Sequence, residues 1–302
     1  MVDRLRSVLS ALGAILTGAG VLILLFVAYQ LWGTGLYTSR QQGSLRSEFN
    51  DKLKAATAAP STTSTTVNPA NLPPPLPSGE SVATIRIPKI GVDKTVVQGV
   101  GLADLRKAPG HYPETPMPGE QGNAAIAGHR TTYGAPFNRL DELAPGDQIL
   151  VTTLKGSFAY TVTGSKVVKP SQVEVLNATP TPTLTLTTCN PKYSAKERLI
   201  VSATLDPGQK ATAPSPTATT APGQQAAIPG DEPTGDTAGL ASDRSKTSTI
   251  LWGILTAGIG IGWWLAIRKR RHWVSYAGGI VPFLVSLFFF YAHLELLLPA
   301  NF

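Results

Sequence analysis

The strongest candidate for covalent chemistry in this chain is its single cysteine, Cys189. A cysteine thiolate is a good nucleophile, and a lone cysteine has no partner for an intramolecular disulfide. Cys189 follows an alternating apolar and polar run, 184–188, and precedes an Asn-Pro pair. This pattern predicts a strand that ends at the cysteine and presents the thiol to a cleft. An inert buried thiol and an intermolecular disulfide are the competing interpretations.

A catalytic cysteine needs a neighbouring group that takes its proton. The chain has four histidines, of which His272 lies in a basic segment and His293 in an apolar run. Only His111 and His129 lie in the same segment as the cysteine. His129 follows a run of small residues that predicts a strand, whereas His111 lies in a Pro-Gly-His-Tyr-Pro stretch that is typical of a turn. We therefore favour His129 as the acid and base, against the plain alternative of a hydrogen-bonded loop histidine.

Acyl transfer to a cysteine also needs a group that stabilises the oxyanion. Arg198 begins the next predicted strand, nine residues after Cys189, so a strand–turn–strand hairpin would return it beside the thiol. Its guanidinium stays charged and donates hydrogen bonds in a fixed fork. A solvent-exposed arginine beside Glu197 is the alternative interpretation, and Arg130 and Lys196 are competing cations.

These residues fall within a segment of ordinary domain size, residues 80–205. Short runs of β-forming residues recur through it, separated by Gly, Pro and Asp. We predict strands at 82–87, 92–97, 123–127, 148–153, 158–168, 184–188 and 199–205, and short helices at 102–106 and 137–143. Many short strands at close spacing are typical of a β-barrel or sandwich, so the predicted fold is mainly β.

Residues 185–189 read TLTTC and, with His129 before them and Arg198 after them, this segment resembles the sortases, the cysteine transpeptidases of the Gram-positive cell surface. The stretches GHRTTYGAPFNRLDEL, from Gly128, and TLTTCNPKYSAKERLIVSATL, from Thr185, are most similar to class E sortases of actinobacteria. The resemblance covers about residues 80–205. It implies a sortase-type closed β-barrel of about eight strands with short helices.

The resemblance also implies a role for each site residue. Cys189 is the nucleophile, His129 the general acid and base, and Arg198 the stabiliser of the tetrahedral intermediates. Thr188 and Tyr112 are candidate substrate-binding residues, although Thr188 is equally well explained as a β-forming residue. Tyr112 is the candidate contact for an alanine-bearing signal, because class E members prefer LAXTG-type signals over LPXTG.

The partners implied are surface proteins that bear a sorting signal and the amine of a lipid-linked peptidoglycan precursor. No cofactor and no metal is implied, and no clear acidic cluster suggests calcium. Two other functions compete with transpeptidation. A hydrolytic cysteine protease would share Cys189 and His129, but papain-like proteases place their cysteine before their histidine. A membrane-tethered binding or scaffold module would carry an inert thiol, and the TLTTC context disfavours it.

Three apolar runs frame the predicted domain, at 8–32, 249–267 and 273–298. Each has about the 20 residues that cross the hydrocarbon core of a membrane, although a cleaved signal peptide is an alternative for the first. Arg4 and Arg6 and the basic loop 268–272 predict a cytoplasmic location for residues 1–7 and for that loop. The sequence thus predicts a multi-pass protein of the cell membrane, in contact with its lipid, with the catalytic domain and the tail 299–302 on the extracellular face.

Residues 33–79 and 206–248 are predicted linkers, because long parts of both are rich in Pro, Thr, Ala and Gly and lack apolar periodicity. The chain has a net charge of +7, of which residues 268–271 supply four. This charge is a topology signal rather than the basic face of a nucleic-acid-binding protein, so no nucleic acid partner is expected. The single cysteine also excludes a disulfide scaffold and a Cys-based zinc or iron–sulfur site.

Overall fold

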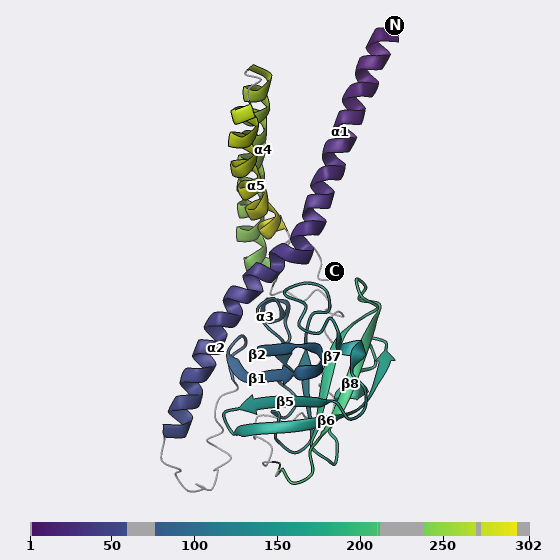
Figure 1. Cartoon of the computed structure of the whole chain (residues 1–302), viewed down its shortest axis with the longest axis vertical. Coiled ribbons are helices and arrows are strands. Elements are labelled where there is room, and N and C mark those ends of the chain that lie inside the picture. Colours follow the sequence, from purple (N-terminus) through teal and green to yellow (C-terminus); the bar gives the residue numbers. More distant parts are fainter. Residues whose placement is uncertain (1, 59–75, 210, 212–237, 270–272, 295–302) are drawn as a thin grey trace. The chain divides into compact units, whose positions relative to one another are not determined.

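The computed structural model describes residues 2–58, 76–209, 211, 238–269 and 273–294 (Figure 1). These residues divide into two compact units, one within 1–33 and 233–299 and the other within 34–232. The central parts of the two predicted linkers, 59–75 and 212–237, lie outside the described residues, as do residues 270–272 of the basic loop and residues 295–302. The β-rich segment belongs to the second unit.

The second unit is built on a closed barrel of eight strands, which confirms the predicted fold. The strands are β1 (Ser81–Ile87), β2 (Val92–Gln98), β3 (Gly110–His111), β4 (Asn123–Ala127), β5 (Gln148–Thr153), β6 (Gly156–Val168), β7 (Thr183–Asn190) and β8 (Glu197–Leu205). Their order around the barrel is β1-β2-β3-β4-β7-β8-β6-β5, and β5 pairs with β1 to close it. Most pairs are antiparallel, but β2 runs parallel to β3 and β4 runs parallel to β7.

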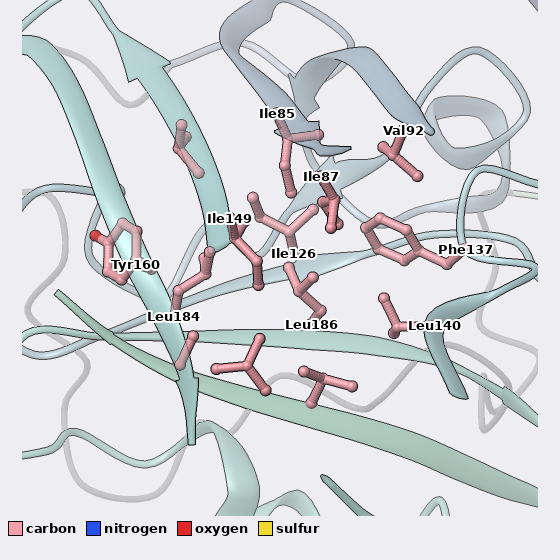
Figure 2. Close-up of a cluster of buried hydrophobic side chains, with 14 of the residues drawn as sticks. Ile85, Ile87, Val92, Ile126, Phe137, Leu140, Ile149, Tyr160, Leu184 and Leu186 are labelled. Atoms are coloured by element: carbon pink, nitrogen blue, oxygen red, sulfur yellow. The ribbon is translucent and has the colours of Figure 1, made fainter. Parts of the chain in front are cut away.

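Alternating apolar residues fill the barrel interior, and Figure 2 shows side chains from several strands converging there. Ile85 and Ile87 from β1, Ile149 from β5, and Leu184 and Leu186 from β7 are fully buried. Because side chains alternate across a strand, the intervening residues of β7 face outward. The outer face of β4 and β7 carries a second, smaller apolar cluster of Leu105, Tyr112, Ala125 and Ala127.

Short helical turns join the strands. They are η3 (Pro88–Ile90), α3 (Leu102–Leu105), η4 (Leu140–Glu142) and η5 (Val173–Leu176). The predicted helix at 102–106 is present as α3, whereas the one predicted at 137–143 is reduced to the 3-10 turn η4. Phe137 and Leu140 are both buried in the barrel core, so their apolar character serves tertiary packing rather than one face of a helix.

Residues 34–58 fall within the predicted linker 33–79, but they form helix α2 (Thr34–Ala58), which lies beside β1 and β2 (Figure 1). Leu45 and Phe49 are buried. Gln42 pairs with the backbone of Thr95 in both directions, since its Nε2 donates to Thr95 O at 3.0 Å and its Oε1 accepts from Thr95 N at 2.8 Å. The linker prediction fails over this stretch because the helix docks through few apolar residues and many polar ones, which leaves little hydrophobic periodicity.

The first unit contains α1 (Val2–Ala28), the π-helical turn η1 (Tyr29–Gly33), α4 (Ala238–Lys269) and α5 (Trp273–Leu294). Two helical stretches among the described residues are long and apolar enough to cross a membrane, Leu16–Ala58 and Lys246–Ile267. The apolar part of α5, Gly278–Leu294, is shorter. The three predicted apolar runs are thus helical over their described residues, and the number of membrane crossings stays a prediction.

Aromatic and small residues pair α4 with α5. The rings of Trp252 and Phe289 stack at 4.7 Å between centroids, and those of Trp263 and Phe283 lie 5.9 Å apart. A Cβ atom at Gly279 would meet the indole of Trp263 at 1.8 Å, so only glycine allows this close approach. The two helices therefore form a packed hairpin.

Candidate active site

His129 and Cys189 are brought to one edge of the barrel by two parallel strands. In the register of β4 and β7, Ala127 lies opposite Thr187, and Gly128 N donates to Thr187 O at 3.1 Å. His129 and Cys189 each stand two residues beyond this matched pair. Because side chains alternate along strands, both point to the outer face, over the small apolar cluster.

Arg198 reaches the same place through the β7–β8 hairpin, in which it lies directly opposite Cys189. Side chains opposite one another in an antiparallel pair have Cβ atoms about 4.5–5.5 Å apart. Arg198 is only 2% exposed. Its Nη1 donates to Ala195 O at 2.7 Å and to Glu197 O at 2.9 Å, which fixes the guanidinium beside the thiol.

The three side chains line one open cleft with a cavity volume of about 70 Å³. Leu102 and Leu105 of α3 form an apolar part of its wall. Tyr193 and Ser194 of the β7–β8 connection also line it. Burial of a substrate here would exclude water from the thiol. Within the described ranges, no group of three or more His, Cys, Asp or Glu side chains is arranged to hold a metal ion.

The environment of His129 favours a neutral imidazole. Its Nε2 atom is buried and has no hydrogen-bond partner in the part of the chain that the structure describes. Burial, together with the positive charge of Arg106, lowers the pKa of His129 from 6.5 to about 4. The ring of Tyr133 lies 4.9 Å from the imidazole ring, tilted by 39°. At neutral pH the site therefore offers a proton acceptor beside the thiol.

Arg130, a competing cation in the sequence, lines the same cleft and contacts the backbone of Cys189. Its Nη1 donates to Cys189 O at 3.0 Å and to Asn190 Oδ1 at 2.8 Å, and its Nη2 is 3.1 Å from Asp141 Oδ2. The guanidinium thus holds the backbone of Cys189. The other competitor, Lys196, is exposed and is not among the residues that line the cleft.

Comparison with known proteins places this site in a family. The sortase domain matches residues 85–206. Sortase SrtE1 of Streptomyces coelicolor is 34% identical over 207 residues, which cover 63% of this chain and 55% of that protein. Sortase D of Bacillus subtilis is 31% identical over 141 residues, which cover 46% of this chain and 69% of that protein. The chain belongs to the sortase family.

The match to SrtE1 confirms the expected likeness to class E sortases, although the chain spans only 55% of the length of that relative. A solved structure of sortase E from Streptomyces avermitilis is 39% identical, with a TM-score of 0.38, and the match covers 43% of this chain and 90% of that one. The family match begins within β1 and ends just after β8, so it covers the barrel and not α2.

The two predicted substrate-binding residues of this sortase occupy different positions. Thr188 lines the cleft, and its Oγ1 donates to Gly128 O at 2.8 Å, which ties β7 to the segment that carries His129. Tyr112 is fully buried beneath the cleft, with its hydroxyl 3.2 Å from Thr187 Oγ1, and burial raises its pKa. Tyr112 is not among the residues that line the cleft, and its contact with a peptide stays a prediction.

His111, predicted as a turn residue, instead lies in the two-residue strand β3. It is 1% exposed, with Nδ1 3.0 Å from Gln98 Oε1 and Nε2 2.9 Å from Pro116 O. Its position away from the cleft leaves His129 as the histidine of the site. Sequence reasoning missed Tyr133, because its contact with His129 depends on the path of an irregular loop that no periodicity reports.

Proposed function

We propose that this sortase is a membrane-anchored cysteine transpeptidase that acts on proteins with a C-terminal sorting signal of LAXTG or LPXTG type. It cleaves the signal between Thr and Gly and joins the new carboxyl end to an amine of a cell-wall precursor. One observation carries the proposal: two strand registers bring the thiol of Cys189, the imidazole of His129 and the guanidinium of Arg198 into one cleft.

In the first step the sulfur of Cys189 attacks the carbonyl carbon of the signal threonine. The thiol proton passes to His129, whose neutral form is favoured by its lowered pKa of about 4. The oxyanion that forms is stabilised by Arg198. The C–N bond to glycine then breaks, the glycine amine leaves with the proton from His129, and a thioester to Cys189 remains.

In the second step an amine of the precursor attacks the thioester carbonyl. His129 takes the proton that the amine gives up, a new amide bond forms, and Cys189 leaves as the thiolate and recovers the proton. The overall reaction exchanges one amide for another and needs neither an oxidant nor a cofactor. The acceptor is the amine of a lipid-linked peptidoglycan precursor, which an enzyme held at the membrane meets at the lipid surface.

The proposed topology follows from the charge clusters of the sequence. The basic residues before α1 and between α4 and α5 stay in the cytoplasm, and the barrel stands on the extracellular face. The three apolar helices then make a multi-pass anchor. This arrangement brings the cleft to the side of the membrane where surface proteins emerge.

The test uses the full chain in detergent, a peptide that contains an LAXTG signal, and an amine acceptor. Mass spectrometry should detect a thioacyl adduct on Cys189 that disappears when the amine is added, with a matching transfer product, and Cys189→Ala should form neither. If water hydrolyses the adduct and none of the amines tested accepts the peptide, the protein is a hydrolytic protease instead. A folded protein with a free thiol and no adduct from LAXTG or LPXTG peptides would reject both enzymes and favour the binding module.

A further inference from the structure

A strained turn follows His129 in the chain. Residues 133–135 all have a left-handed backbone, with φ of 52° at Tyr133, 72° at Gly134 and 42° at Ala135. Residues other than glycine rarely adopt this backbone conformation, and it persists only where surrounding contacts fix it. The contacts that fix this turn therefore also fix Tyr133, whose ring packs against the imidazole of His129.

Helix α2 provides those contacts. The backbone N–H of Tyr133 donates to Thr34 Oγ1 at 3.1 Å, and the Thr34 side chain is 1% exposed. The helix and the turn also approach closely at two glycines. A Cβ atom at Gly35 would lie 4.0 Å from Gly134 Cα, and one at Gly134 would lie 3.6 Å from the methyl group of Thr38.

Tyr133 connects the turn to the imidazole of His129. The Tyr133 ring lies 4.9 Å from the ring of His129, and the guanidinium of Arg106 lies 5.8 Å from the same tyrosine ring. Arg106 is itself tied to α2, because Thr38 Oγ1 donates to Arg106 O at 3.1 Å. Two threonines one helical turn apart on α2 thus hold Tyr133 and Arg106, the cation that packs against its ring.

We infer that Thr34 of α2 is a positioning residue for His129, acting through the backbone and ring of Tyr133. The inference rests on the proposed function, because it assigns Thr34 a role in the reaction of Cys189. Thr34 is not among the residues that line the cleft and lies outside the part of the chain that matches the sortase domain. Helix α2 therefore completes the active site rather than serving as a spacer.

Loss of the contact between Thr34 and the turn should raise the pKa of His129. The charged and titratable groups around its ring are Arg106, from the segment after α3, together with Arg130, Cys189 and Arg198 of the cleft. Burial disfavours the imidazolium, and so does the positive charge of Arg106. If the turn moves away, water reaches the ring and the pKa of His129 rises from about 4 toward 6.5.

The first test is Thr34→Val in the full chain in detergent, which removes the acceptor and keeps the shape. We expect kcat for peptide transfer to fall about 10-fold with KM changed less than about 2-fold, because the residue does not touch the peptide. Thr34→Ser restores the acceptor and should restore kcat. The matched control is Thr57→Val on the exposed face of the same helix, where the hydroxyl donates to Leu53 O and Lys54 O, and it should leave kcat unchanged.

The second readout does not depend on any peptide. NMR titration of the imidazole of His129, assigned by its loss in His129→Gln, should show a raised pKa in Thr34→Val and not in Thr34→Ser or Thr57→Val. If Thr34→Val fails to fold, Tyr133→Leu removes the ring instead and should give the same loss of kcat and the same shift.

Unchanged kcat and an unchanged titration in a folded Thr34→Val protein would overturn the inference. Equal losses in Thr34→Val and Thr57→Val would also overturn it, because they would report helix stability alone. If the full chain transfers no peptide at all, the proposed function fails, and the NMR titration still decides whether Thr34 sets the environment of His129.

Discussion

At the residue scale, the groups of the candidate site are held in place by backbone register and by donors that bind carbonyl groups. Arg130 donates to the carbonyl of Cys189, Arg198 donates to the carbonyls of Ala195 and Glu197, and Thr188 donates to the carbonyl of Gly128. These bonds fix the backbone around the sulfur and the imidazole, while the buried Nε2 of His129 makes no hydrogen bond within the described residues. Because the imidazole of His129 is uncharged at neutral pH, it can accept the proton of the thiol.

The first residue-scale prediction concerns the geometry of Arg198. Arg198→Lys keeps the positive charge but loses the planar guanidinium, whose Nη1 donates to Ala195 O and Glu197 O. We expect kcat/KM for transfer to fall by about 10²–10³-fold, the range seen when an oxyanion donor is removed. Alkylation of Cys189 by iodoacetamide should proceed at nearly the wild-type rate, because the thiol is untouched. Full activity of the lysine variant would show that charge alone suffices.

The second residue-scale prediction concerns His111 and pH. Burial lowers the pKa of His111 from 6.5 to about 4, partly offset by the carbonyl of Pro116. As the pH falls through 6.5 the unfolded chain takes up this proton first, so the free energy of unfolding decreases between pH 6.5 and 4. The full contribution of this histidine is roughly 3 kcal/mol.

Calorimetry of the full chain checks this at pH 7 and pH 5. The midpoint of barrel unfolding should fall less in His111→Gln than in the wild type, since glutamine does not titrate. Part of the fall should remain in the variant, because His129 has a similarly lowered pKa. Equal falls in both proteins would contradict the assignment.

At the scale of elements, the sequence predicts well those strands whose own residues carry the signal. Alternation marks β1 and β7, and Pro88 correctly ends β1. The strand β3 escapes prediction because it has two residues and depends on pairing with its neighbours. The positions of Cys189, His129 and Arg198 follow from strand ends and spacing, whereas the contact between Tyr133 and Thr34 joins a loop to a distant helix and leaves no local pattern.

The element-scale prediction concerns the docking of α2. Phe49 is 1% exposed, so Phe49→Ala should destabilise the second unit by about 3–5 kcal/mol, the cost of removing a buried aromatic side chain. Denaturant unfolding of the full chain measures this. The control is Leu36→Ala on the same helix, where the leucine is 60% exposed and the change should stay within about 0.5 kcal/mol. Equal effects of the two substitutions would mean that α2 does not dock through its buried face.

At the scale of the whole molecule, the chain joins a catalytic barrel to apolar helices at both ends of the sequence, and the proposed function requires the barrel to face outward. The single cysteine makes this directly testable, because a membrane-impermeant maleimide reports on Cys189 alone. In intact cells the wild-type protein should be labelled, and Cys189→Ala should not. The double variant Cys189→Ala with His272→Cys moves the cysteine to the basic loop and keeps all four cations of that loop. This cysteine should be labelled only after the membrane is permeabilised. The reverse pattern would place the cleft in the cytoplasm, where it could not reach an extracellular precursor, and the positive-inside argument would then be wrong for this chain.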